Sequence, residues 1–97
     1  MVRTHAEMNT DRAQRYLKQL VSHLQPHCTV EHDAESTRIT LPPDHGSGRC
    51  VLTPLPDRLD IAAEAAREDD LTHLQHVITS HLERFGKRDG LGVSWES

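Results

Sequence analysis

The stretch Glu68–Phe85, with the sequence EDDLTHLQHVITSHLERF, decides the fold because its apolar residues recur at helical spacing. Three acidic residues open the stretch, where the positive end of a helix dipole favours negative charge. Gly86 follows it and can serve as a C-terminal cap. We therefore predict a long amphipathic helix whose buried stripe consists of Leu71, Leu74, Val77, Ile78, Leu82 and Phe85.

A second amphipathic helix is predicted over Asp11–Gln25. Asp11 and Gln14 have the spacing of a capping box, in which two side chains satisfy free backbone groups at the helix start. Pro26 ends the helix, because proline has no N–H group to continue it. The apolar residues again share one face, and they are Ala13, Tyr16, Leu17, Leu20, Val21 and Leu24.

Short alternating segments outside the two helices predict strands. Each segment has one apolar and one polar face, which is typical of an antiparallel sheet covered on one side. Residues 42–48, PPDHGSG, form a loop of chain-breaking residues. The predicted fold is α+β in the order β-α-β-β-β-β-α-β, with one curved antiparallel sheet and two helices on one face. The predicted strands cover residues 2–8, 28–31, 38–41, 50–55, 59–63 and 91–95.

Length and composition restrict the classes of protein. A chain of 97 residues forms a single domain over residues 1–97. Its 35% of apolar and 3% of aromatic residues make a thin core, which helices or a partner subunit must complete. A net charge of −4 argues against nucleic acid as a partner. No apolar run approaches the roughly 20 residues of a membrane span, and the first residues lack a signal-peptide pattern, so we expect a cytoplasmic protein.

His81 is the first candidate site residue, because it falls inside the apolar arc of the second helix. A histidine there either packs in the core, bonded to a strand carbonyl or to Tyr16, or lines a pocket that faces a ligand. His23 lies at the edge of the first helix's apolar stripe, beside Tyr16. If both helices cover the same face of the sheet, His23 and His81 can approach each other.

Other candidate groups are better explained as surface, loop or core residues than as reactive or ligand-binding sites. His73 and His76 stand at i and i+3, but on the polar side of the second helix, where a solvated surface is the simpler interpretation. The glycine-containing loop lacks the lysine and the following helix of a phosphate-binding loop. Cys28 and Cys50 fall on inward rows, where they are expected to be reduced core residues, and two thiols alone make no zinc site. We therefore expect no metal, no cofactor and no catalytic residue.

Several motifs together resemble the bacterial domain-of-unknown-function 2218 family over nearly the whole chain. They are RYLKQL at residues 15–20, His23, the Cys50-x-Leu52 strand, HLERF at residues 81–85 and Trp95. Members are small single-domain bacterial proteins, some of them encoded near siderophore genes, so the resemblance implies a role in iron handling and assigns no reaction. The family usually has an aromatic residue where this chain has Leu24 and a second histidine where it has Pro26. The order of the elements also resembles the TATA-binding-protein-like architecture.

The sequence thus favours a noncatalytic binding or accessory protein. A small ligand, such as a siderophore or another iron-related compound, would lie between the second helix and the sheet. The predicted binding residues are Tyr16, His23, His81 and Trp95, because two aromatic rings and two imidazoles supply apolar area together with hydrogen-bonding groups. The alternative is a homodimeric protein-interaction module without a small ligand, and an enzyme is the less favoured class.

Overall fold

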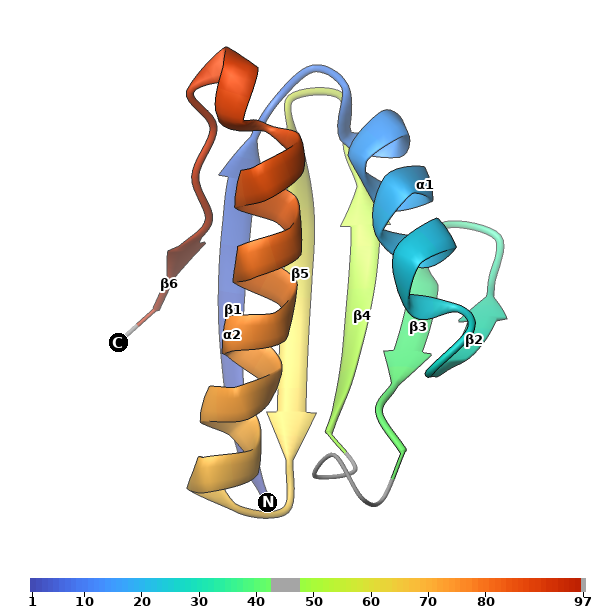
Figure 1. The fold of residues 1–97 in the computed structure, drawn as a ribbon, viewed down its shortest axis with the longest axis vertical. Helices are drawn as coiled ribbons and strands as arrows, with labels where there is room; N and C mark the ends of the chain where they lie inside the picture. Colours follow the sequence, from blue (N-terminus) through green and yellow to red (C-terminus); the bar gives the residue numbers. More distant parts are fainter. Residues whose placement is uncertain (43–47, 97) are drawn as a thin grey trace.

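The computed structural model describes residues 1–42 and 48–96 of the chain. Figure 1 shows the helices and strands in their chain order. The described elements are β1 (Val2–Asn9), α1 (Ala13–Leu24), β2 (Thr29–His32), β3 (Thr37–Thr40), β4 (Arg49–Pro54), β5 (Arg58–Ala65), α2 (Glu68–Phe85), the 3-10 helix η2 (Lys87–Asp89) and β6 (Ser94–Trp95).

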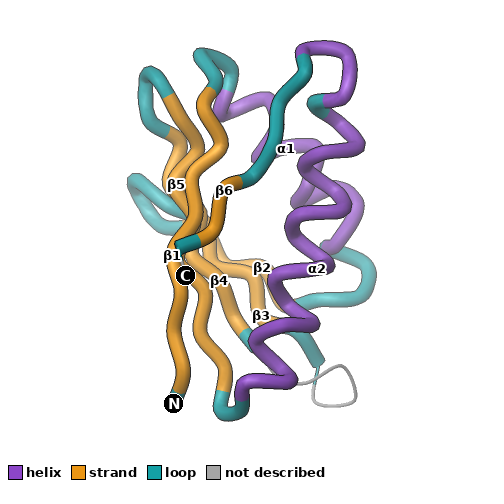
Figure 2. Tube along the Cα trace, turned by 90° about the vertical axis from the view of Figure 1, so that its left-hand side faces the viewer, coloured by secondary structure: helices purple, strands orange, loops and turns teal. Residues whose placement is uncertain are grey.

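The described strands form one antiparallel sheet in the order β2-β3-β4-β5-β1-β6. Figure 2 shows both helices on the same side of this sheet, so the molecule has two layers and one open sheet face. The predicted α+β fold and the order of its elements are therefore confirmed. Among the described helices, none is both long enough and apolar enough to cross a membrane.

Alternation along the strands explains why one face is covered. In β5, Leu59, Ile61 and Ala63 are buried under the helices, while the residues between them face the other way. On the helix side, Leu74 and Ile78 of α2 have no exposed surface. Complete burial of each such leucine or isoleucine side chain stabilises the fold by about 1.5–3 kcal/mol. The core therefore lies between the apolar faces that the sequence predicts.

The helix predicted over Asp11–Gln25 is shorter than expected, because it begins at Ala13 and ends at Leu24. No side chain caps its start, so the predicted capping box of Asp11 and Gln14 is wrong. The backbone N–H of Arg12 donates instead to the hydroxyl of Thr10 at 3.0 Å, and the helix begins after this turn. The longer helix has the predicted bounds, Glu68–Phe85.

The last strand is shorter than predicted. The prediction covered residues 91–95, but only Ser94–Trp95 pair with β1. The N–H of Leu91 donates to the carbonyl of Gly86, and that of Val93 donates to the Glu83 carboxylate. These bonds keep residues 91–93 beside the end of α2, so only the last two residues of the segment pair with the sheet.

The strand predicted at residues 28–31 begins one residue later, at Thr29. Most of the loop predicted at residues 42–48 lies outside the described residues.

Candidate functional site

His81 projects from α2 toward α1 and is half-buried. Its Nδ1 atom lies 2.7 Å from the carbonyl oxygen of Val77, one turn earlier in the same helix. A carbonyl only accepts, so Nδ1 must carry the hydrogen, and in the neutral ring Nε2 keeps its lone pair. The partner is therefore neither a strand carbonyl nor Tyr16, as the sequence suggested, because the carbonyl four residues back in the helix is nearer.

His23 and His81 do meet across the two helices. Their ring centroids are 6.1 Å apart, and Phe85 lies 5.0 Å from His23 and 6.2 Å from His81. His23 is exposed, whereas the other two rings are half-buried. We call His23, His81 and Phe85 the inter-helix cluster. It presents two imidazoles and one apolar ring at the same surface.

A hollow of about 340 Å³ lies between α1 and α2, about one helical turn from the inter-helix cluster. Val77, whose carbonyl holds His81, lines it from α2, and Leu24, which follows His23, lines it from α1. We call it the inter-helix hollow. Its wall is largely apolar and includes His27, His73 and Cys28, and apolar walls with a few polar groups are usual for small-molecule sites. The lining residues are Leu24, His27, Cys28, Leu41, Pro42, His73 and Val77.

Tyr16 lies at the other end of α1 and is almost fully buried, with 4% of its surface exposed. Its hydroxyl donates to a carboxylate oxygen of Asp89 at 2.5 Å, which connects α1 to η2. This hydrogen bond raises the pKa of the Tyr16 phenol above 10.0, and burial adds to the shift. Tyr16 is about 10 Å along the helix axis from His23, so it contributes to the packing of the helix ends.

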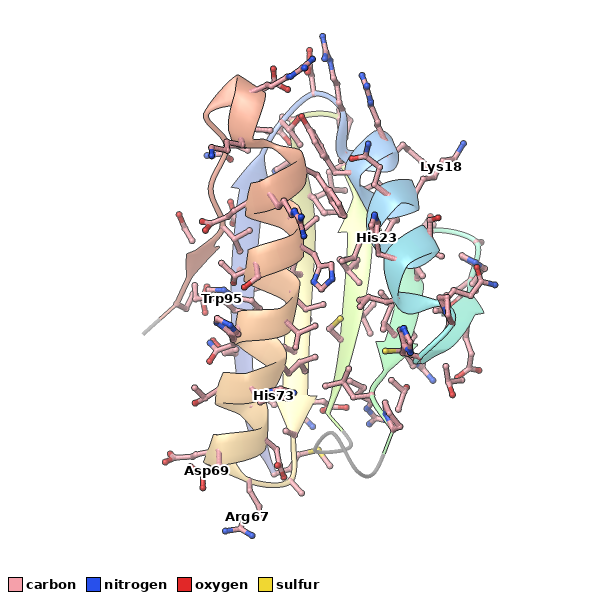
Figure 3. All side chains as sticks on the ribbon, in the orientation of Figure 1. Lys18, His23, Arg67, Asp69, His73 and Trp95 are labelled. Carbon is pink, nitrogen blue, oxygen red and sulfur yellow. The ribbon has the colours of Figure 1, made fainter. Side chains whose placement is uncertain are left out.

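Trp95 lies on the opposite side of α2 from His23, as Figure 3 shows. Its indole N–H donates to the hydroxyl of Thr79 at 2.6 Å. Thr79 and His81 are two residues apart in one helix and therefore point in nearly opposite directions. The structure thus brings two of the four predicted binding residues together, His23 and His81, and places Tyr16 and Trp95 elsewhere.

The cysteines have the character of core residues. Burial raises the pKa of the Cys50 thiol to about 12, and burial also raises the pKa of the half-buried Cys28. Both are free. Because the thiolate is the reactive form, neither residue suits nucleophilic catalysis near neutral pH.

A second group of side chains lies on the open sheet face, and the sequence interpretation did not find it. His5 and Glu7 of β1 share this face with Asp60 of β5, and one ligand atom from each lies within 4.8 Å of the others. His5 Nε2 is 2.6 Å from Asp60 Oδ1. The signal in the sequence was the i, i+2 spacing of His5 and Glu7 on a strand, but Asp60 is brought near only by the register of β1 against β5.

Taken together, the described elements define a small α+β protein whose antiparallel sheet is covered on one face by two helices. The chain belongs to the DUF2218 family, described as an uncharacterized protein conserved in bacteria, whose family model matches residues 5–96. It is similar to PA4090 from Pseudomonas aeruginosa, a structure determined by NMR. The two are 30% identical, the match covers 99% of this chain and 96% of that one, and the TM-score is 0.76. No curated protein matches this chain.

Proposed function

We propose that this protein is a noncatalytic binding domain that takes a small ligand in the inter-helix hollow. The observation that carries the proposal is the largely apolar wall of this 340 Å³ space, which also includes His27 and His73 and reaches Val77, one helical turn before His81. A site of this kind gains affinity from apolar burial and selects its ligand through a few polar groups.

The imidazoles that line the hollow belong to His27 and His73, and a ligand that extends one helical turn past Val77 would also reach His81. Because the Val77 carbonyl holds Nδ1–H, the Nε2 atom of the neutral ring is an acceptor with a fixed direction. His23, which is exposed on the facing helix, adds a second imidazole that can turn toward the ligand. Tyr16 and Trp95 support the site indirectly, because the bond of Tyr16 to Asp89 joins α1 to η2 and the bond of Trp95 to Thr79 joins β6 to α2.

The ligand class follows from these groups. A small molecule with an apolar part and a hydrogen-bond donor suits a leucine and valine wall beside an imidazole acceptor. The family resemblance adds siderophores and other iron-related compounds as the first ligands to test. A cytoplasmic location stays a prediction of the sequence, as does the alternative of a homodimeric interaction module.

Native mass spectrometry of the untagged protein, purified from its own host, tests the proposal. We expect a retained small-molecule mass on the monomer. Val77→Phe would fill the hollow and abolish that mass, whereas His76→Phe, which adds the same ring to the exposed side of α2, would leave it unchanged. Circular dichroism would show that both variants fold.

Two results would overturn the proposal. A bare dimer would favour the interaction module instead. A bare monomer whose backbone amide resonances near His81 and Val77 also fail to shift on addition of a ferric hydroxamate or catecholate siderophore would leave the hollow without a ligand of the expected class.

A further inference from the structure

The open sheet face carries a compact set of metal-ligating side chains. His5 and Glu7 are two residues apart in β1 and therefore project to the same side of the sheet. Asp60 of β5 is the direct cross-strand partner of Glu7 in the antiparallel register. Three side chains of ligand type thus stand on two adjacent strands, away from the helices and from the inter-helix hollow.

The geometry of these groups is close to that of a coordination site. The His5 nitrogen and the two carboxylate oxygens all lie within 4.8 Å of one another, and His5 Nε2 is 2.6 Å from Asp60 Oδ1. Ligand atoms about 2 Å from a common ion are separated by roughly 3–4 Å, so small side-chain rotations would converge them on one cation. Donors on paired strands also need little backbone movement to reach that arrangement.

A fourth side chain orients the imidazole. The other ring nitrogen, Nδ1, lies 3.3 Å from Oε1 of Glu96, which follows β6. The backbone N–H of Glu96 also donates to the carbonyl of His5 at 2.9 Å, so the two residues are tied together. A carboxylate on the far nitrogen of a ligating histidine is the usual outer-shell arrangement at metal sites, since it fixes the tautomer that leaves the near nitrogen free to coordinate.

We propose that His5, Glu7 and Asp60 bind a divalent transition-metal ion such as Zn²⁺ on the open sheet face, with Glu96 as a positioning residue. One imidazole nitrogen with two carboxylate oxygens is a donor set for borderline cations. Three protein ligands leave at least one coordination position for water or for a donor from another molecule. A space of about 260 Å³, lined by His5, Glu7 and Glu96 among others, gives access to that position.

Two nearby cations compete with the metal ion. Arg58 Nε lies 3.9 Å from Oε2 of Glu7, which is an ion pair longer than a hydrogen bond. The proton of His5 is the second competitor, because Asp60 and Glu96 stabilise the imidazolium. Within the part of the chain that the structure describes, the charged groups beside His5 are Asp60, Glu96 and Glu7.

Calorimetric titration of the untagged protein with Zn²⁺ at slightly alkaline pH tests the site. We expect one Zn²⁺ per chain, with affinity reduced at least ~10-fold in Glu7→Gln and in Asp60→Asn. Both variants keep the size of the side chain, and the amide oxygen that Asp60→Asn introduces would still accept from His5. The matched control is His76→Gln, because His73 and His76 are spaced on α2 in a way that suits adventitious Zn²⁺ binding.

A second measurement locates the ion independently of affinity. In the amide NMR spectrum, Mn²⁺ should broaden resonances around His5 and Asp60, and this broadening should vanish in Glu7→Gln. The absence of Zn²⁺ binding would overturn the proposal. So would binding that survives in Glu7→Gln and disappears in His76→Gln, because the ion would then lie on α2.

Discussion

The imidazole of His5 and the carboxylate of Asp60 face each other across β1 and β5, with Nε2 and Oδ1 2.6 Å apart. The two residues are 55 positions apart in the sequence. Asp60 is the main cause of the raised pKa of His5, through this hydrogen bond and through its charge, and Glu96 adds to the shift. The pair therefore couples the protonation of one histidine to the pairing of the two strands.

The first prediction concerns the pH dependence of stability. The folded-state pKa of His5 is raised above its ordinary value of 6.5, so the pair stabilises the fold fully below pH 6.5. This contribution is lost as the pH rises through the folded-state pKa. We expect His5→Gln to lower the urea midpoint at mildly acidic pH and to lower it less as the pH rises. His76→Gln, an exposed histidine on α2, is the control. A deficit that grows with pH would contradict the expected sign.

The second prediction concerns the hydrogen bond that joins the start of α1 to η2. Tyr16→Phe removes the hydroxyl that donates to Asp89, and we expect a loss of about 1 kcal/mol in the free energy of unfolding. Tyr16 is the chain's single tyrosine, so phenolate absorbance reports it alone. In the folded protein this absorbance should appear above the ordinary pKa of 10.0, whereas in urea it should appear at that value. Equal titrations in both states would show that the bond to Asp89 does not form.

The third prediction concerns the attachment of β6 to α2. Thr79→Val keeps the shape of the side chain but leaves the indole N–H of Trp95 without its acceptor. We expect a loss of about 1–2 kcal/mol, together with faster amide exchange in Ser94–Trp95. Trp95 is the single tryptophan, so its fluorescence maximum should shift to longer wavelength as the strand loosens. Thr79→Ser restores the hydroxyl and should restore the spectrum; a spectrum unchanged in both variants would argue against the bond.

The fourth prediction concerns the two thiols. Cys50 is 1% exposed and has a pKa raised to about 12, so it should resist alkylation in the folded protein. Cys28 is half-buried and should react first, though slowly, because burial raises its pKa as well. Mass spectrometry of iodoacetamide-treated protein should find a single modification, which Cys28→Ser removes. Rapid modification of Cys50 without urea would show that the sheet opens under native conditions.

Much of the fold follows from local periodicity. The 3.6-residue spacing of Leu71, Leu74 and Ile78 predicts the long helix and its bounds, and alternation in residues 59–63 predicts the buried face of β5. Helix and strand ends were less predictable. The start of α1 depends on a bond from the Arg12 N–H to the Thr10 hydroxyl, and the shortness of β6 depends on a bond from the Val93 N–H to the Glu83 carboxylate.

The candidate sites depend more on contacts between distant segments. The sequence placed His81 inside one apolar stripe and His23 at the edge of the other, and the packing of α1 against α2 brings their rings to 6.1 Å. Trp95 was grouped with them, but the side of α2 that it contacts is decided by where β6 joins β1.

By itself, the sequence determined the type and order of the elements and which face of each is apolar, because those properties repeat within a few residues. The tertiary structure alone decided that Asp60 stands beside His5 and Glu7, and that Asp89 accepts from Tyr16. The physical reason is that strand register and helix packing are set by burying the whole apolar surface at once. No single segment carries that information. Polar groups from distant segments therefore come together only when the packing of the core has fixed the positions of the strands and helices.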